Sequence, residues 1–138
     1  MSALDACKPQ IIRALEKDGW QIVEKPHQIG FNDRMAYADF SARHVNEDDE
    51  QFIIVMEVKC FTNPKADLTE LYTAIGQYQF YIAAMRSNRE EFPLYLAIPT
   101  TAYLRFLEAT VLLDAFQIAR VKLVVVDISQ EVVERWIH

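Results

Sequence analysis

Residues 52–60 read Phe-Ile-Ile-Val-Met-Glu-Val-Lys-Cys, a nearly continuous apolar run that ends with a carboxylate and an ammonium group. This composition predicts a buried β-strand. Because successive side chains on a strand point to opposite faces, Glu57 and Lys59 share one face. Burying a single charge is costly. The two residues are therefore either an ion pair or part of a functional site.

The rest of the chain predicts an α/β domain in which a mixed sheet is flanked by helices. Residues 67–87 carry apolar side chains at spacings of three and four, as in an amphipathic helix capped by Asp67. The members of this stripe are Leu68, Leu71, Ile75, Tyr78 and Ile82. Residues 27–34 contain glycine, asparagine and aspartate and predict a loop, and residues 46–50 predict an acidic turn.

The predicted order of elements is αβββαβαββ. In sequence these are a helix at 4–17, strands at 20–23, 35–43 and 51–60, a helix at 67–87, a strand at 92–98, one helix or two at 101–118, and strands at 121–126 and 132–137. The first three strands can form a meander. The later strands are separated by helices and can join the sheet by crossovers.

The composition bounds the classes of function. An apolar fraction of 51% and a charged fraction of 25% are typical of a globular protein, and residues 1–138 are expected to form one domain. Only three glycines are present, without a GxGxxG or Walker pattern, which argues against a glycine-rich phosphate loop. The net charge of −6 disfavours strong unaided DNA binding, because basic side chains supply much of the affinity for phosphates.

The chain carries no sequence feature of export. Its first residues lack the basic and apolar regions of a secretory signal, and no apolar run approaches the about 20 residues of a membrane span. Cys7 and Cys60 have no metal-ligand spacing, and Cys60 alternates onto the apolar face of its strand. We therefore expect a cytoplasmic protein with no membrane association and with both thiols reduced.

Asp39 is the second carboxylate of the predicted site. If the strands before and after the acidic turn pair antiparallel, Asp39 approaches Glu57. Two such carboxylates bind a hard cation such as Mg²⁺, with Mn²⁺ as the alternative, and the carbonyl of Val58 adds a third oxygen. Lys59 then polarises a metal-bound water or stabilises charge on a phosphate. The pattern favours phosphodiester hydrolysis as much as its alternative, a strand-end ion pair with Asp39 in a turn.

Gln77 and Tyr81 lie four residues apart in the predicted helix and share a face. That face is semi-polar and lies opposite the apolar stripe. A helix with two such faces is either enclosed by the protein or shared with a partner. For this pair alone, hydrogen bonding at the surface is the simpler explanation.

The chain contains a set of residues that resembles the D…(D/E)-x-K…Q-x-x-x-Y pattern of the PD-(D/E)xK nuclease superfamily. The set consists of Asp39, Glu57-Val58-Lys59 and Gln77-x-x-x-Tyr81. The predicted element order is similar to that superfamily's restriction-endonuclease-like core. More narrowly, the chain resembles the XisH family, excision-controlling factors for a cyanobacterial DNA element. This resemblance is carried by residues 14–20, 38–40, 57–61, 74–78, 94–99 and 136–137.

Two departures from these patterns concern the first helix. Many nucleases of the superfamily carry a glutamate there that faces the site, and the candidates here are Asp5 and Glu16. Members of the XisH family tend to have histidine at the position of Lys8. These departures leave the role of this helix in catalysis open.

The resemblance implies an excision-controlling factor in site-specific DNA rearrangement that acts on DNA with a XisI-like partner protein, with a homo-oligomer as a further option. In one interpretation it is a Mg²⁺-dependent endodeoxyribonuclease, with Asp39 and Glu57 as ligands, Lys59 as transition-state stabiliser, and Gln77 and Tyr81 in support. In a second, favoured by the acidic charge, it is a catalytically silent regulatory or protein-interaction module. A third is an α/β interaction protein without a nucleic-acid role.

Overall fold

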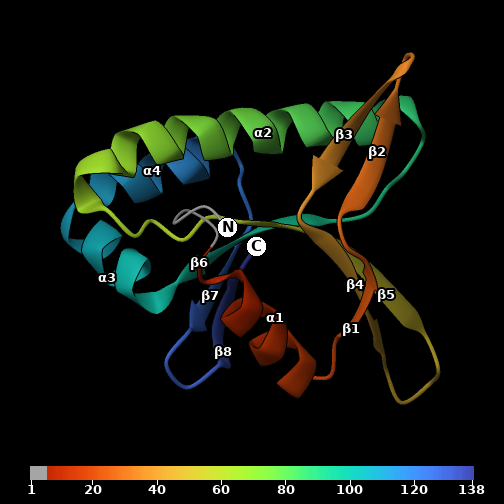
Figure 1. Ribbon diagram of the computed structural model, residues 1–138, viewed down its shortest axis with the longest axis horizontal. Coiled ribbons are helices and arrows are strands. Elements are labelled where there is room, and N and C mark those ends of the chain that lie inside the picture. The colour runs from red at the N-terminus through yellow and green to blue at the C-terminus, as the bar shows by residue number, and fades with distance from the viewer. Residues whose placement is uncertain (1–5) are drawn as a thin grey trace.

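The computed structural model describes residues 6–138, so the predicted helix start at residue 4 and the candidate Asp5 lie outside the described part. Figure 1 shows a mixed sheet with α1 on one side and α2, α3 and α4 on the other, and a small hairpin beside one end of α2. This is the predicted α/β class. None of the described helices is long and apolar enough to cross a bilayer.

The elements are α1 (Lys8–Lys17), β1 (Gln21–Glu24), β2 (His27–Phe31), β3 (Arg34–Ala38), β4 (Phe40–Val45), β5 (Gln51–Val58), η2 (Pro64–Ala66), α2 (Asp67–Ser87), β6 (Leu94–Pro99), α3 (Thr100–Glu108), α4 (Thr110–Ile118), β7 (Leu123–Asp127) and β8 (Val132–Ile137). The six-stranded sheet has the order β1-β4-β5-β6-β7-β8. As predicted, β1, β4 and β5 form an antiparallel meander. The strands β5, β6 and β7 run parallel through helical crossovers, and β8 returns antiparallel to β7.

The central strand β5 is buried on both faces. Val55 packs in the apolar cluster under α2, α3 and α4, whereas Ile54, Met56 and Val58 pack in the cluster under α1. Because side chains alternate along a strand, Glu57 lies on the same face as Val55, toward α2. The strand ends at the carboxyl edge of the parallel part of the sheet, where open α/β sheets commonly bind ligands.

The segment predicted as a loop at residues 27–34 is instead mostly a β-hairpin. Strand β2 pairs antiparallel with β3, from His27 opposite Ala38 to Phe31 opposite Arg34. Asn32, at the turn, has a left-handed φ of 50°. Ile29 is fully buried and His27 is 6% exposed, so one face of this hairpin packs into the interior.

The segment predicted as a single strand at residues 35–43 is two strands, β3 and β4, that belong to different sheets and meet at Asp39. The Asp39 carboxylate accepts a hydrogen bond from the Val58 amide at 2.7 Å. That side chain takes the place of the backbone partner that a continued β4 would provide. The pairing of β4 with β5 therefore begins only at Phe40, opposite Met56.

The first turn and the buried face of α2 differ from the predicted pattern. Asp67 is the first residue of the helix rather than its N-cap. Its carboxylate accepts two hydrogen bonds from the Arg105 guanidinium of α3, both at 2.8 Å. Leu68 is 55% exposed. The helix buries Glu70, Leu71, Ala74, Tyr78, Tyr81, Ala84 and Met85. Because α2 packs against both the sheet and the β2–β3 hairpin, Tyr81 belongs to this buried surface and not to an opposite face.

The two cysteines also differ from expectation. Cys7 and Cys60 form a disulfide that joins the residue before α1 to the chain just after β5, with their Cα atoms 5.8 Å apart. The packing of α1 across β5 brings the two positions together, although 53 residues separate them. This contradicts the prediction of separate reduced thiols.

Candidate functional site

The two predicted carboxylates lie next to each other where β4 begins and β5 ends. The backbone amide of Asp39 donates a hydrogen bond to Glu57 Oε1 at 3.2 Å. The amide of Val58 donates to Asp39 Oδ2 at 2.7 Å. One oxygen of each carboxylate is therefore fixed by the backbone, and the antiparallel β4–β5 register explains why the sequence predicted their approach.

Each of the other two carboxylate oxygens lies near a lysine. Lys59 Nζ is 3.8 Å from Glu57 Oε2, and Lys8 Nζ is 2.9 Å from Asp39 Oδ1. Lys59 was predicted at the site. Lys8, the first residue of α1, was not, because only the packing of α1 over the end of β5 brings it there. The site thus holds two acidic and two basic groups.

The electrostatics of Glu57 show that the site disfavours a bare pair of negative charges. Glu57 is only 6% exposed. Burial, and next the charge of Asp39, raise the pKa of Glu57 to about 8, although Lys59 and Lys8 act in the opposite direction. At neutral pH the Glu57 carboxyl therefore carries a proton for most of the time. A cation that replaced this proton would remove the repulsion between the two acids.

Helix α2 contributes Tyr81 and Gln77 to the surroundings. The Tyr81 hydroxyl donates a hydrogen bond to the carbonyl of Tyr37 at 2.9 Å, which ties α2 to β3 just before Asp39. Burial raises the pKa of Tyr81, and the charges of Glu57 and Asp39 raise it further, so the phenol lies close to both acids. Gln77 Oε1 is buried without a hydrogen-bond partner among the described residues. Within residues 6–138, no hydrogen bond joins Gln77 to the two carboxylates.

Glu70 is a buried acid of α2 that the sequence analysis missed. It is 6% exposed, and neither carboxylate oxygen has a hydrogen-bond partner in the described part of the chain. Burial raises the pKa of Glu70, and the charge of Lys59 acts against this increase. The sequence could have indicated Glu70, because it lies seven residues, or two helical turns, before Gln77 and therefore on the same side of α2. Glu16, the other candidate acid, is exposed near the far end of α1.

The donor set fits a hard divalent cation held partly by water or substrate. Asp39 Oδ1 and Glu57 Oε2 are the carboxylate oxygens that no backbone amide holds. Mg²⁺ commonly binds through one or two carboxylates and completes its shell with water and phosphate oxygens. Within residues 6–138, no group of three or more His, Cys, Asp or Glu side chains has metal-binding geometry. This part of the chain therefore does not supply a complete set of side-chain ligands for a metal ion.

These features define a class of protein: a mixed α/β domain with a carboxylate pair and a lysine at the carboxyl end of a central strand. Comparison with curated proteins finds no match. The profile of the family described as XisH protein matches residues 1–134, and the chain belongs to this family.

Two crystal structures are similar to almost the whole chain. An XisH family protein from Nostoc punctiforme PCC 73102 is 33% identical, with a TM-score of 0.84 over 97% of this chain and 100% of that one. An fdxN element excision controlling factor protein from Anabaena variabilis is 31% identical, with a TM-score of 0.83 over 97% of this chain and 99% of that one. The family resemblance inferred from the sequence is thus confirmed.

Proposed function

We propose that this protein is an excision-controlling factor in site-specific DNA rearrangement and that its carboxylate–lysine site is a metal-dependent endodeoxyribonuclease centre of the PD-(D/E)xK type. The role is supported by the family and by the similarity to the Anabaena variabilis excision controlling factor. The catalytic part rests on one observation. Asp39, Glu57 and Lys59 meet at the end of β5, with both acids anchored by backbone amides.

In this proposal, Asp39, Glu57 and the carbonyl oxygen of Val58 would hold Mg²⁺ or Mn²⁺. The bound cation would lower the pKa of its water and screen the phosphate. Lys59 stabilises the negative charge that develops on the phosphorus oxygens while a water oxygen bonds to phosphorus and the ester bond breaks. The proton that the water loses passes to solvent, and the leaving ester oxygen takes up a proton from solvent. Gln77 supports the site with its unpaired amide oxygen, and Tyr81 fixes the chain just before Asp39.

The charge of the protein suggests that it does not hold DNA alone. The net charge is −6, whereas affinity for DNA comes largely from basic side chains that neutralise phosphates. We propose that a XisI-like partner protein supplies the missing basic surface, with a second copy of the chain as the alternative. We propose that the protein acts on this DNA in the cytoplasm.

One observation favours the second candidate function, a catalytically silent regulatory module. Lys8 Nζ lies 2.9 Å from Asp39 Oδ1, at the position where a divalent cation would bind. In such a module, the Lys8 ammonium would neutralise the acid pair in place of a metal ion. The protein would then keep the nuclease fold without catalysing cleavage. The two functions differ in whether a divalent cation displaces Lys8.

The discriminating experiment is a cleavage assay on supercoiled plasmid and on a branched DNA junction, with Mg²⁺ or Mn²⁺, with and without the partner protein. We expect cleavage by the wild type, loss of cleavage in Asp39→Asn and Lys59→Ala, and normal cleavage in the control Lys25→Ala, which changes an exposed lysine after β1. Absence of cleavage by the wild type under every condition would contradict the nuclease and leave the regulatory module.

A further inference from the structure

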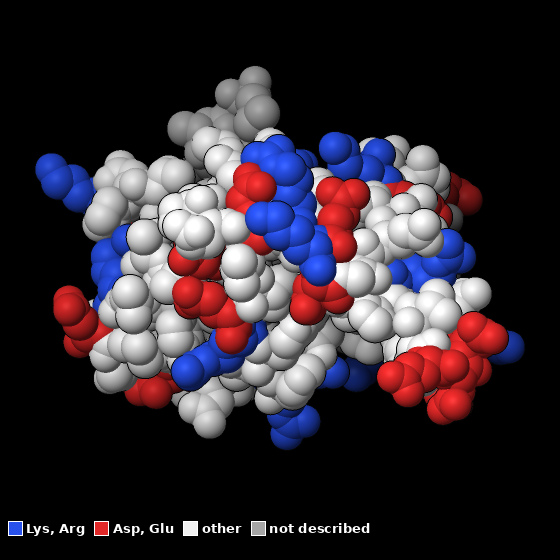
Figure 2. Space-filling model, turned by 90° about the horizontal axis from the view of Figure 1, so that it is seen from below, with Lys and Arg blue, Asp and Glu red and all other residues white. Residues whose placement is uncertain are grey.

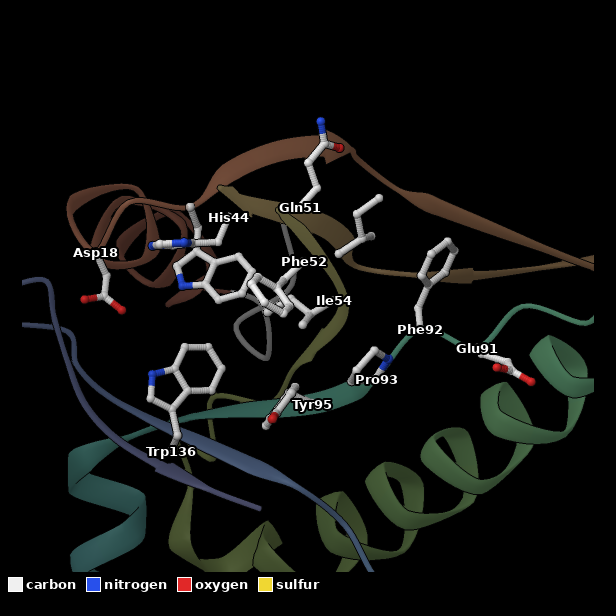
Figure 3. Close-up of a pocket in the computed structure, with 12 residues that line it drawn as sticks. Asp18, His44, Gln51, Phe52, Ile54, Glu91, Phe92, Pro93, Tyr95 and Trp136 are labelled. Atoms are coloured by element: carbon white, nitrogen blue, oxygen red, sulfur yellow. The ribbon is translucent and has the colours of Figure 1, made fainter. Parts of the chain in front are cut away.

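A groove with a volume of about 620 Å³ lies on the α1 face of the sheet. Figure 3 shows its walls, which come from the chain just after α1, from β4, β5, β6 and β8, and from residues 91–93 before β6. Its aromatic lining consists of Trp20, His44, Phe52, Phe92, Tyr95 and Trp136. Phe52 precedes Glu57 by five residues, or about 17 Å along β5. The neighbouring lining residue Ile54 faces α1, whereas Glu57 faces α2. The groove is therefore separate from the carboxylate site.

Four of these aromatic rings contact one another in a chain from His44 through Trp20 and Trp136 to Tyr95. The ring centroids of Trp20 and Trp136 are 5.7 Å apart, and Trp136 packs edge-to-face on Tyr95 at 5.1 Å. Trp20 also packs edge-to-face on His44 at 5.1 Å. Phe52 is 51% exposed. These ring contacts position the aromatic side chains relative to one another.

The rim of this groove is acidic. Figure 3 shows Asp18 and Glu91 at its two ends with the aromatic side chains between them. Both acids are exposed, and none of the described residues that line the groove is lysine or arginine. The adjoining β4–β5 turn adds four acidic residues at positions 47–50. Figure 2 shows acidic side chains gathered at the end of the molecule that carries this turn.

We propose that this groove binds an arginine side chain from a basic segment of a partner protein. A guanidinium can stack flat on the tryptophan rings by cation–π attraction and can pair with carboxylates at the rim. The Tyr95 ring already has Lys122 Nζ at 5.7 Å from its centroid, so the tryptophans are the stacking surface. A volume of about 620 Å³ accommodates one such side chain together with its apolar neighbours. Nucleic acid fits poorly, because its phosphates would meet Asp18, Glu91 and the acidic turn. The proposal does not depend on nuclease activity.

Intrinsic fluorescence can test this directly, because the chain has two tryptophans and both line the groove. The probe is the acetylated, amidated tetrapeptide Leu-Arg-Arg-Leu, titrated into the full chain. The control peptide replaces each arginine by citrulline, which has the same shape without the charge. Asp18→Asn with Glu91→Gln removes the acidic rim, and Asp114→Asn on α4 is the matched control for the loss of an exposed acid.

We expect a saturable fluorescence change with a Kd of about 1 mM or tighter, and binding about tenfold weaker for the citrulline peptide and for the rim variant. The Asp114→Asn variant should bind like the wild type, and urea midpoints should show that all variants fold. No response up to about 10 mM peptide, or equal binding of citrulline, would overturn the proposal. Stronger quenching by oligothymidylate, or a change with protein concentration alone, would instead indicate nucleic acid or self-association.

Discussion

Replacement of Glu57 by glutamine should stabilise the protein in the absence of divalent cations, and more strongly as the pH rises. Burial raises the pKa of Glu57 from 4.5 to about 8 in the folded state. The favourable contribution of a protonated carboxyl is therefore complete below pH 4.5 and is lost as the pH rises through 8. Glutamine keeps the shape of the side chain and an oxygen that can accept the hydrogen bond from the Asp39 amide.

The size of the effect follows from this proton uptake. At pH 7, which lies 2.5 units above 4.5 (7 − 4.5), folding must protonate a group that is ionised in the unfolded chain. At 1.36 kcal/mol per pH unit this penalty is at most about 3 kcal/mol. At pH 5, only 0.5 units above 4.5 (5 − 4.5), the same arithmetic gives less than about 1 kcal/mol. The advantage of glutamine should therefore grow by about 2–3 kcal/mol between these pH values.

The assay is urea denaturation in EDTA from pH 5 to pH 8 for the wild type and Glu57→Gln. Glu47→Gln in the exposed β4–β5 turn is the matched control and should show no such trend. A stability difference that does not vary with pH, or a Glu57→Gln protein that is less stable at pH 8, would refute the reasoning. Either result would mean that burial and the neighbouring Asp39 charge do not raise the pKa of Glu57 in the folded protein.

Three further predictions concern the surroundings of the site and the core. Lys8→Met should raise the affinity for Mn²⁺ severalfold in a binding titration, because Lys8 no longer competes for Asp39 Oδ1; unchanged affinity would count against that competition. Glu70→Gln should raise the urea midpoint at pH 7 but hardly at pH 5, because burial raises the pKa of Glu70; a lower midpoint at pH 7 would contradict this. Leu15→Ala, at a fully buried position on the inner face of α1, should lower the free energy of unfolding by about 2–5 kcal/mol. The exposed control Val111→Ala should change it little, and an equal loss in both would be the contrary result.

Much of the fold could be predicted because its signals are local. The apolar run of β5 and the helical spacing around Leu71 and Tyr78 give the central strand and α2. The approach of Asp39 to Glu57 followed from an antiparallel pair around one turn, which needs no knowledge of distant residues. The confirmed order of β1, β4 and β5 has the same origin.

The remaining features depend on contacts between distant parts of the chain. Lys8 reaches Asp39 and Cys7 reaches Cys60 only because α1 packs across the end of β5. Glu70 looks like an ordinary surface residue of an amphipathic helix until the sheet and the neighbouring loop enclose it. The β2–β3 hairpin was missed because Gly30 favours a loop locally, whereas the packing of the hairpin against α2 decides the structure.

The most direct test of whether Asp39 and Glu57 bind a divalent cation is a Mn²⁺ titration followed by electron paramagnetic resonance. We expect one Mn²⁺ per chain, with an affinity that increases with pH by up to about tenfold per unit until pH 8, as Glu57 loses its proton. Binding should be lost in Asp39→Asn and retained in Glu47→Gln. Failure of the wild type to bind Mn²⁺ at pH 8, or equal binding by Asp39→Asn, would contradict the account.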